Sequence, residues 1–162
     1  MRSFSFAFTL IASFVLAQFA PTYANDLAAQ KGWVSIKSTH DYPTMIKRVN
    51  AAAKVNKIGI VSRASATVGA AKVLKKKIPG NMVVGLYHPR FAVRMLQASI
   101  AAGIEAPIRV YITENTDGTA TLSYKKPSTV FAPYMNTGGE KLKALATELD
   151  TLFDAVAKHA TN

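Results

Sequence analysis

The spacing of the apolar residues changes repeatedly along the chain, from the period of two typical of strands to the period of about 3.6 typical of helices. The strand-like stretches predict strands over residues 33–37, 57–62, 108–112 and 120–124, and residues 81–87, which are apolar on both faces, predict a central strand. The helical stretches predict helices over residues 43–55, 66–77, 91–102 and 138–159. This β-α-β-α-β-α-β-β-α order predicts an α+β fold: a single compact two-layer domain with helices packed on one mainly antiparallel or mixed sheet.

Local signals mark several ends of these elements. Asp41 can cap the first helix, because its side chain can accept hydrogen bonds from unpaired N–H groups of the first turn. The sequence Asn-Thr-Asp-Gly at 115–118 predicts a hairpin between the last two strands. Thr137 and Glu140 have the spacing of a capping box for the last helix, and the segment before it, residues 127–136, is expected to be irregular.

Each predicted helix has one apolar face that we expect to pack on the sheet. We expect Pro79-Gly80 to stop the second helix and Gly103 to end the third. The residues expected to point inward are Met45, Val49 and Ala52 in the first helix, Val68, Ala71 and Leu74 in the second, Phe91, Met95 and Ser99-Ile100 in the third, and Leu142, Leu145, Leu149, Leu152 and Val156 in the last.

The first 24 residues have the features of a Sec-type signal peptide. Arg2 supplies the positive charge, residues 7–20 form a mainly apolar stretch, and Thr22 and Ala24 are small residues at the −3 and −1 positions of a cleavage site. We therefore predict cleavage after Ala24 and a periplasmic or secreted mature protein. Residues 25–162 would form one domain, with a core over residues 33–134 and a C-terminal helix over residues 138–159.

Composition excludes several kinds of chemistry. The chain has 162 residues and no Cys, which excludes disulfides, thiolate catalysis, Cys-ligated zinc and iron–sulfur clusters. No apolar run of the mature chain reaches the 18 or so residues of a stable transmembrane span. The sequence contains no strong catalytic motif, and this favours a non-catalytic protein. A catalytic triad assembled in space from distant residues stays open as an alternative.

Two histidines mark the predicted ligand site. His40 lies just before a helix and His88 at the end of a central strand, in positions where loops gather over a sheet edge. We predict a pocket between them, to which Arg90 and Arg94 add positive charge that favours an anionic ligand. A lesser alternative is a haem iron or a metal ion held by His40 and His88, and another is that both are ordinary loop residues. The sequence names no cofactor and no particular metal.

Positive charge is the third candidate functional feature. The chain has a formal net charge of +11, and Lys75-Lys76-Lys77 and Lys125-Lys126 are its densest basic runs. Lysines at helix ends commonly serve solubility and compensate the helix dipole. The functional alternative is a basic surface that binds anionic components of the cell envelope. Nucleic acid is not an expected partner, because the protein is predicted to be exported and lacks an aromatic and basic stripe.

Several motifs together resemble the family called domain of unknown function 302. Residues 38–42 (STHDY) resemble its S-x-H-[SD]-[FY] motif, and residues 85–89 (GLYHP) with 94–98 (RMLQA) resemble its strand, G-N-P turn and helix. Residues 106–111 (APIRVY) are similar to its L-P-L-[RK]-V strand, and residues 123–127 (SYKKP) to its S-Y-x-x-P motif. The resemblance covers most of the predicted mature domain.

The resemblance implies a compact two-layer α+β fold and brings no established activity. Tandem copies in some members imply self-association, so a homodimer is a possible assembly. We add Tyr124, from the fourth motif, to the candidate ligand-binding residues His40, His88, Arg90 and Arg94. Two departures alter any site built from the family's usual residues: Arg63-Ala64-Ser65 replaces an I-D-H stretch, and His88 replaces the Asn of G-N-P.

Sequence alone therefore supports an exported, non-catalytic binding module for a small ligand or a protein partner. The alternative is a basic surface that binds anionic envelope components. The identity of the ligand is left open.

Overall fold

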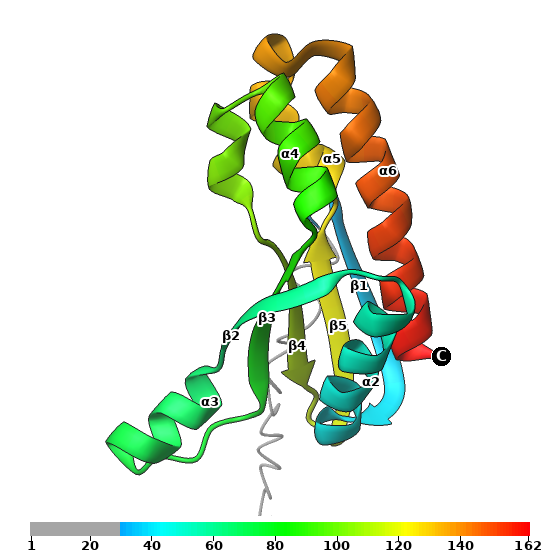
Figure 1. Ribbon diagram of the computed structural model, residues 1–162. Helices are drawn as coiled ribbons and strands as arrows, with labels where there is room; N and C mark the ends of the chain where they lie inside the picture. Colours follow the sequence, from blue (N-terminus) through cyan, green and yellow to red (C-terminus); the bar gives the residue numbers. More distant parts are fainter. Residues whose placement is uncertain (1–29) are drawn as a thin grey trace, which may run out of the picture.

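A single antiparallel sheet organises the part of the chain that the structure, a computed structural model, describes: residues 30–162. The strands follow the order β1-β5-β4-β3-β2 across the sheet, and every neighbouring pair is antiparallel (Figure 1). Their bounds are β1 Trp33–Asp41, β2 Gly59–Ala64, β3 Asn81–Tyr87, β4 Ile108–Glu114 and β5 Thr119–Lys125. The predicted α+β fold is confirmed. The predicted signal peptide lies outside the described residues.

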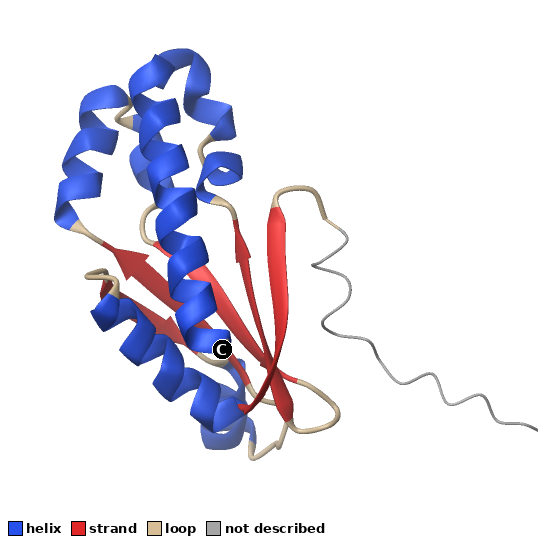
Figure 2. Ribbon diagram, turned by 90° about the vertical axis from the view of Figure 1, so that its right-hand side faces the viewer, coloured by secondary structure: helices blue, strands red, loops and turns tan. Residues whose placement is uncertain are grey.

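The helices cover one face of this sheet. Figure 2 shows the long helices on one side of the strands, and the opposite side carries no helical layer among the described residues. Among the helices of residues 30–162, none combines the length and the apolar character needed to cross a bilayer. The helical elements are α2 Tyr42–Val55, α3 Ala66–Gly69, η1 Ala70–Leu74, α4 Pro89–Ala98, η2 Ala101–Glu105, α5 Pro127–Val130, η3 Ala132–Tyr134 and α6 Met135–Thr161.

Strand alternation separates the two faces of the sheet, because successive side chains of a strand point to opposite sides. The helix-covered face carries the apolar residues of the strands, which pack in one core with α2, α4 and α6. The inward residues predicted for α2 are all buried, and in α6 Leu142, Leu145, Leu149 and Val156 are buried while Leu152 is half-buried. The strand residues on this face include Val34, Ile36, Val84, Leu86, Val110, Ile112, Leu122 and Tyr124.

The second predicted helix differs most from expectation. It forms the short α3 and then the π-helical turn η1, and neither contains a buried residue. Val68 and Leu74, expected to point inward, are 48% and 62% exposed. An apolar helical pattern implies burial only where another element faces it. In the described structure, η1 packs substantially on α3 alone.

The third predicted helix is shorter than expected. Helix α4 ends at Ala98, because Ser99 adopts an extended conformation, and the separate 3₁₀ helix η2 follows. Ile100 falls in the break and is 83% exposed, so its predicted burial is wrong. Gly103 lies inside η2 rather than at the end of α4.

The last helix begins without the predicted capping box. Helix α6 starts at Met135, and the Thr137 hydroxyl donates to the carbonyl of Tyr134 instead of accepting an N–H. Gly139 interrupts the helix with a φ of 55°, a conformation that suits glycine. The segment predicted to be irregular, residues 127–136, forms α5 and η3 before α6 begins.

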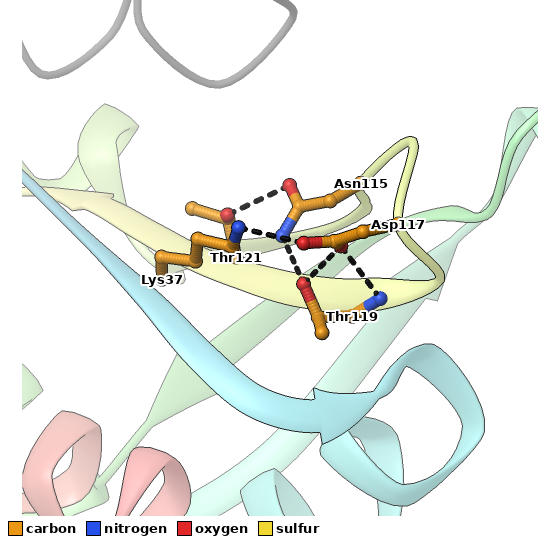
Figure 3. A network of polar contacts seen from close by, with 5 residues as sticks. All are labelled: Lys37, Asn115, Asp117, Thr119 and Thr121. Carbon is orange, nitrogen blue, oxygen red and sulfur yellow. Dashed lines mark hydrogen bonds and ion pairs between the residues drawn. The ribbon is translucent and has the colours of Figure 1, made fainter.

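The predicted hairpin is confirmed, and its turn also holds the edge strand β1. Asp117 accepts hydrogen bonds from the backbone N–H and the hydroxyl of Thr119, and its other oxygen lies 2.7 Å from Lys37 Nζ (Figure 3). Asn115 Nδ2 donates to the Thr119 hydroxyl, and the Thr121 hydroxyl donates to Asn115 Oδ1, both at 2.9 Å. The Lys37 contact and the Thr119 hydrogen bonds lower the pKa of Asp117 well below its usual range.

Candidate functional site

The structure places His40 and His88 at opposite ends of the sheet. His40 is the next-to-last residue of β1, beside Asp41, which pairs with Thr119 at the start of β5. His88 follows β3, whose first residue, Asn81, lies at the Thr119 end of the sheet. The predicted pocket between the two histidines is therefore not formed. One haem iron or metal ion held by both is excluded by the same geometry.

The physical reason is the antiparallel direction of the strands. β1 and β3 run in opposite directions, so their C-terminal ends lie at opposite edges. Ligands bind at the shared carboxyl ends of the strands only where the strands of a sheet are parallel. Among residues 30–162, no group of three or more His, Cys, Asp or Glu side chains is placed to hold a metal ion.

His88 has a structural role at the start of α4. Its Nδ1 accepts the backbone N–H of Arg90 at 3.1 Å, so the ring caps the helix. The same ring meets Phe91 edge-on, with centroids 5.7 Å apart. Arg90 and Arg94 both place their guanidinium carbons over the Phe91 ring, at 5.6 and 5.8 Å. The predicted residues His88, Arg90 and Arg94 thus form one cluster.

A hollow of about 530 Å³ lies beside this cluster. His88, Arg90 and Lys57 line it on one side, and Glu148 of α6 lines it on the other. Glu148 is already paired with Arg94 at 2.6 Å. The hollow is basic, but it offers a ligand few free polar groups, because its carboxylate, Glu148, already pairs with Arg94. Ligand binding by His88, Arg90 and Arg94 stays a prediction.

The other two predicted residues lie elsewhere. Tyr124 is 2% exposed on the helix-covered face, where its ring packs against Phe153. Burial, followed by the charges of Asp154 and Asp150, raises the pKa of Tyr124 to about 12. The His40 backbone N–H donates to the Ser38 hydroxyl, and the buried His40 Nε2 has no hydrogen-bond partner in the described structure. Neither residue lines the basic hollow.

A larger concavity lies on the face of the sheet that the helices leave uncovered. This sheet-face groove has a volume of about 910 Å³. Its lining includes Trp33, Arg109, Tyr111, Ser123 and Lys125. Register brings these residues into two adjacent rows, because Trp33 pairs with Lys125 and Tyr111 pairs with Ser123. Among these five residues, the basic run at 125–126 had marked only Lys125 as a functional candidate, while Arg109, Tyr111 and Ser123 lie in the segments that resemble family motifs.

The groove combines apolar lining with two positively charged side chains, Arg109 and Lys125. Arg109 and Lys125 are exposed, and within residues 30–162 neither has a carboxylate within 4.0 Å. Glu105 also lines the groove, but its carboxylate accepts the Tyr134 hydroxyl at 2.8 Å. That hydrogen bond raises the pKa of Tyr134. The hydroxyls of Ser35 and Ser123 bond each other at 2.8 Å in the neighbouring row.

The sequence contained a signal for this groove. In 108–125, the residues between the apolar ones are Arg109, Tyr111 and Thr113 on one strand and Thr121, Ser123 and Lys125 on the other. This alternation places them on one face of the hairpin. An antiparallel sheet covered on a single side leaves such a face available for a ligand.

The fold and the groove define a class of protein: a small two-layer α+β domain whose antiparallel sheet, within residues 30–162, carries helices on one face and a groove with two basic side chains on the other. The family described as domain of unknown function DUF302 matches residues 34–160. The chain belongs to this family, so the resemblance inferred from the motifs is confirmed.

A solved structure has the same fold. The crystal structure of an uncharacterized conserved DUF302 protein from Bacillus stearothermophilus aligns with a TM-score of 0.71 at 17% sequence identity. The alignment covers 81% of this chain and 99% of that one. At this identity the likeness supports the fold alone. No curated protein matches the chain.

Proposed function

We propose that this protein is a non-catalytic binding module that takes a small anionic ligand in the sheet-face groove. One observation carries the proposal: Arg109 and Lys125 stand beside Trp33 and Tyr111 in a concavity of about 910 Å³. That volume falls within the range of about 300–1,000 Å³ that is common for small-molecule sites.

The side chains indicate the chemistry of the ligand. Trp33 and Tyr111 offer aromatic surface to a flat or apolar group, while the guanidinium of Arg109 can bind a carboxylate or phosphate through two hydrogen bonds. The Lys125 ammonium adds a second positive charge. We therefore expect an anion that also carries a ring or another flat apolar portion.

The anionic fluorophore 1-anilinonaphthalene-8-sulfonate provides a direct test. Trp33 is the only tryptophan of the chain, so quenching of its emission reports occupancy near the groove. We expect saturable quenching that weakens at least fivefold in Arg109→Gln and in Tyr111→Ala. The matched control is Lys141→Gln on α6, which removes a charge from an exposed position outside the groove.

Equal probe affinity in all three variants would contradict the proposal. A second result would also contradict it: a stable dimer in light scattering, together with a groove that the probe cannot enter. The homodimer predicted from the resemblance would then cover this face. Native mass spectrometry of protein purified from its own host would identify a retained ligand.

We also propose that the protein is exported and that its mature form begins at Asn25. The support is the sequence alone: Arg2, the apolar stretch at 7–20 and the small residues Thr22 and Ala24. Intact-mass measurement of protein from the periplasm and the medium decides the matter. A mass that retains residues 1–24 would contradict the proposed processing.

A further inference from the structure

The positive charge of the chain is concentrated in one segment. Residues 42–104 contain no Asp or Glu, and their eleven Lys and Arg residues equal the whole formal net charge of +11. The remainder of the chain is neutral in sum. The eleven residues are Lys47, Arg48, Lys54, Lys57, Arg63, Lys72, Lys75, Lys76, Lys77, Arg90 and Arg94.

The densest part of this charge lies on a projection, residues 66–78, which we call the arm. Figure 1 shows α3, which begins the arm, standing away from the sheet and from the other labelled helices. Lys72, Lys75, Lys76 and Lys77 are exposed, and so are the apolar residues between them. Val73 is 78% exposed and Leu74 is 62% exposed, which is unusual for adjacent large apolar side chains.

The base of the arm is fastened to the first residue of β3 and to the segment just before it. At its start, the Ser65 hydroxyl donates to the Asn81 carbonyl at 2.6 Å, and Asn81 Oδ1 accepts the N–H of Ala66 at 2.9 Å. Thr67, in the first turn of the arm, also holds the base: its hydroxyl donates to the Pro79 carbonyl, just beyond the arm, and accepts the Asn81 N–H, both at 2.9 Å. The arm is therefore held at its base, and it presents Val73 and Leu74 to solvent.

We propose that the arm docks on the surface of an anionic lipid bilayer. Val73 and Leu74 would enter the headgroup region, where apolar side chains leave water, and the four lysines would lie at the level of the anionic headgroups. Charge complementarity supports this occupant, since no acidic residue occurs anywhere in residues 42–104 to repel the surface. A convex tip with two apolar side chains needs no matching cavity in a bilayer, whereas a protein partner would have to supply one.

Vesicle flotation tests the proposal with the full folded chain. The probes are vesicles of equal parts phosphatidylglycerol and phosphatidylcholine, compared with vesicles of phosphatidylcholine alone, at low ionic strength. We expect binding to the anionic vesicles only, with a steep loss at 0.5 M salt. The triple variant Lys75→Gln, Lys76→Gln, Lys77→Gln is expected to lower the partition coefficient roughly a hundredfold.

Two further variants separate charge from position. Lys141→Gln, Lys143→Gln, Lys158→Gln removes the same charge from exposed positions of α6 and is expected to lower partition less than fivefold. Val73→Ser, Leu74→Ser keeps all the charge and is expected to lower partition at least fivefold. The arm contains no buried side chain of α3 or η1, so unchanged thermal melts will verify that its variants fold.

Equal binding to both kinds of vesicle would overturn the proposal, and so would equal loss in the two triple-lysine variants. A dimer that forms without lipid and dissociates in Val73→Ser, Leu74→Ser would assign the arm to a second copy of the chain and would also overturn it.

Discussion

The ring of Tyr124 lies 5.7 Å from the ring of Phe153, centroid to centroid, at an angle of 48° between their planes. The contact joins β5 to α6 within the core. Burial against Phe153 and its neighbours disfavours the tyrosinate anion, and the carboxylates of Asp154 and Asp150 add to this effect. The pair therefore links core packing to the behaviour of the protein at alkaline pH.

We predict that Tyr124 makes the fold sensitive to alkali. Its pKa is about 12 in the folded protein against 10.0 ordinarily, so its contribution to stability is complete below pH 10 and is lost as the pH rises from 10 to 12. Urea unfolding at pH 8 and pH 11 should show a smaller decline for Tyr124→Phe than for the unaltered chain. Tyr111→Phe, on the opposite face, should leave the contribution of Tyr124 in place, and an equal decline in all three proteins would refute the prediction.

We predict that Leu149→Ala destabilises the protein by roughly 2–5 kcal/mol, because the side chain is 5% exposed and its removal leaves a cavity. Leu152→Ala, one turn along the same helix but only half-buried, should cost clearly less. Urea melts of both variants measure the difference. A loss below about 0.5 kcal/mol for Leu149→Ala would mean that α6 is peripheral to the core.

We predict that the ring of His88 is needed chiefly as a helix cap. His88→Ala removes the acceptor of the Arg90 N–H and should cost about 0.5–2 kcal/mol. His88→Asn should retain most of the stability, because an Asn side chain also accepts from the first turn, and Asn is the residue that the family motif has here. If both variants lose the same stability in thermal melts, the contact with Phe91 matters more than the cap.

We predict opposite effects for two glycine substitutions. A Cβ at Gly85 would collide with the Ser62 hydroxyl and lie 2.8 Å from Pro107 Cγ, so Gly85→Ala should destabilise the fold by roughly 1–3 kcal/mol. A Cβ at Gly69 meets nothing within 4 Å, and Gly69→Ala should stabilise the helix by roughly 0.5–1 kcal/mol. Calorimetry of the two variants checks both signs, and a neutral Gly85→Ala would show that Pro107 can move aside.

The features that sequence predicted well are those fixed by neighbours along the chain. The Asp41 side chain accepts from Thr44 N at 2.7 Å, as expected of a helix cap, and the turn at residues 115–118 joins β4 and β5 as expected. In each case a few adjacent residues contain both the donor and the acceptor. The apolar stripe of α6 was also predictable, because the stripe is long and regular and packs against several elements at once, among them α2, α4 and β1.

The features that sequence missed depend on where distant segments meet. The positions of His40 and His88 follow from the direction of each strand, which the residues beside them do not encode. The exposure of Leu74 follows from the absence of a facing element over the arm in the described structure. The groove could be predicted only by knowing which face of the sheet lacks helices. With that known, the alternation around Tyr111 shows which side chains line the groove.

The pairing of the first strand with the last has a consequence for biosynthesis. Ser35 and Ser123, which bond across β1 and β5, are 88 residues apart, and Ser38 bonds the carbonyl of Thr161, 123 residues away. At ordinary translation rates the ribosome needs roughly 4 to 18 seconds to make the partner of β1 after β1 itself. During that time β1 has no partner strand, so the sheet stays incomplete and the core beneath β1 and β5 cannot close.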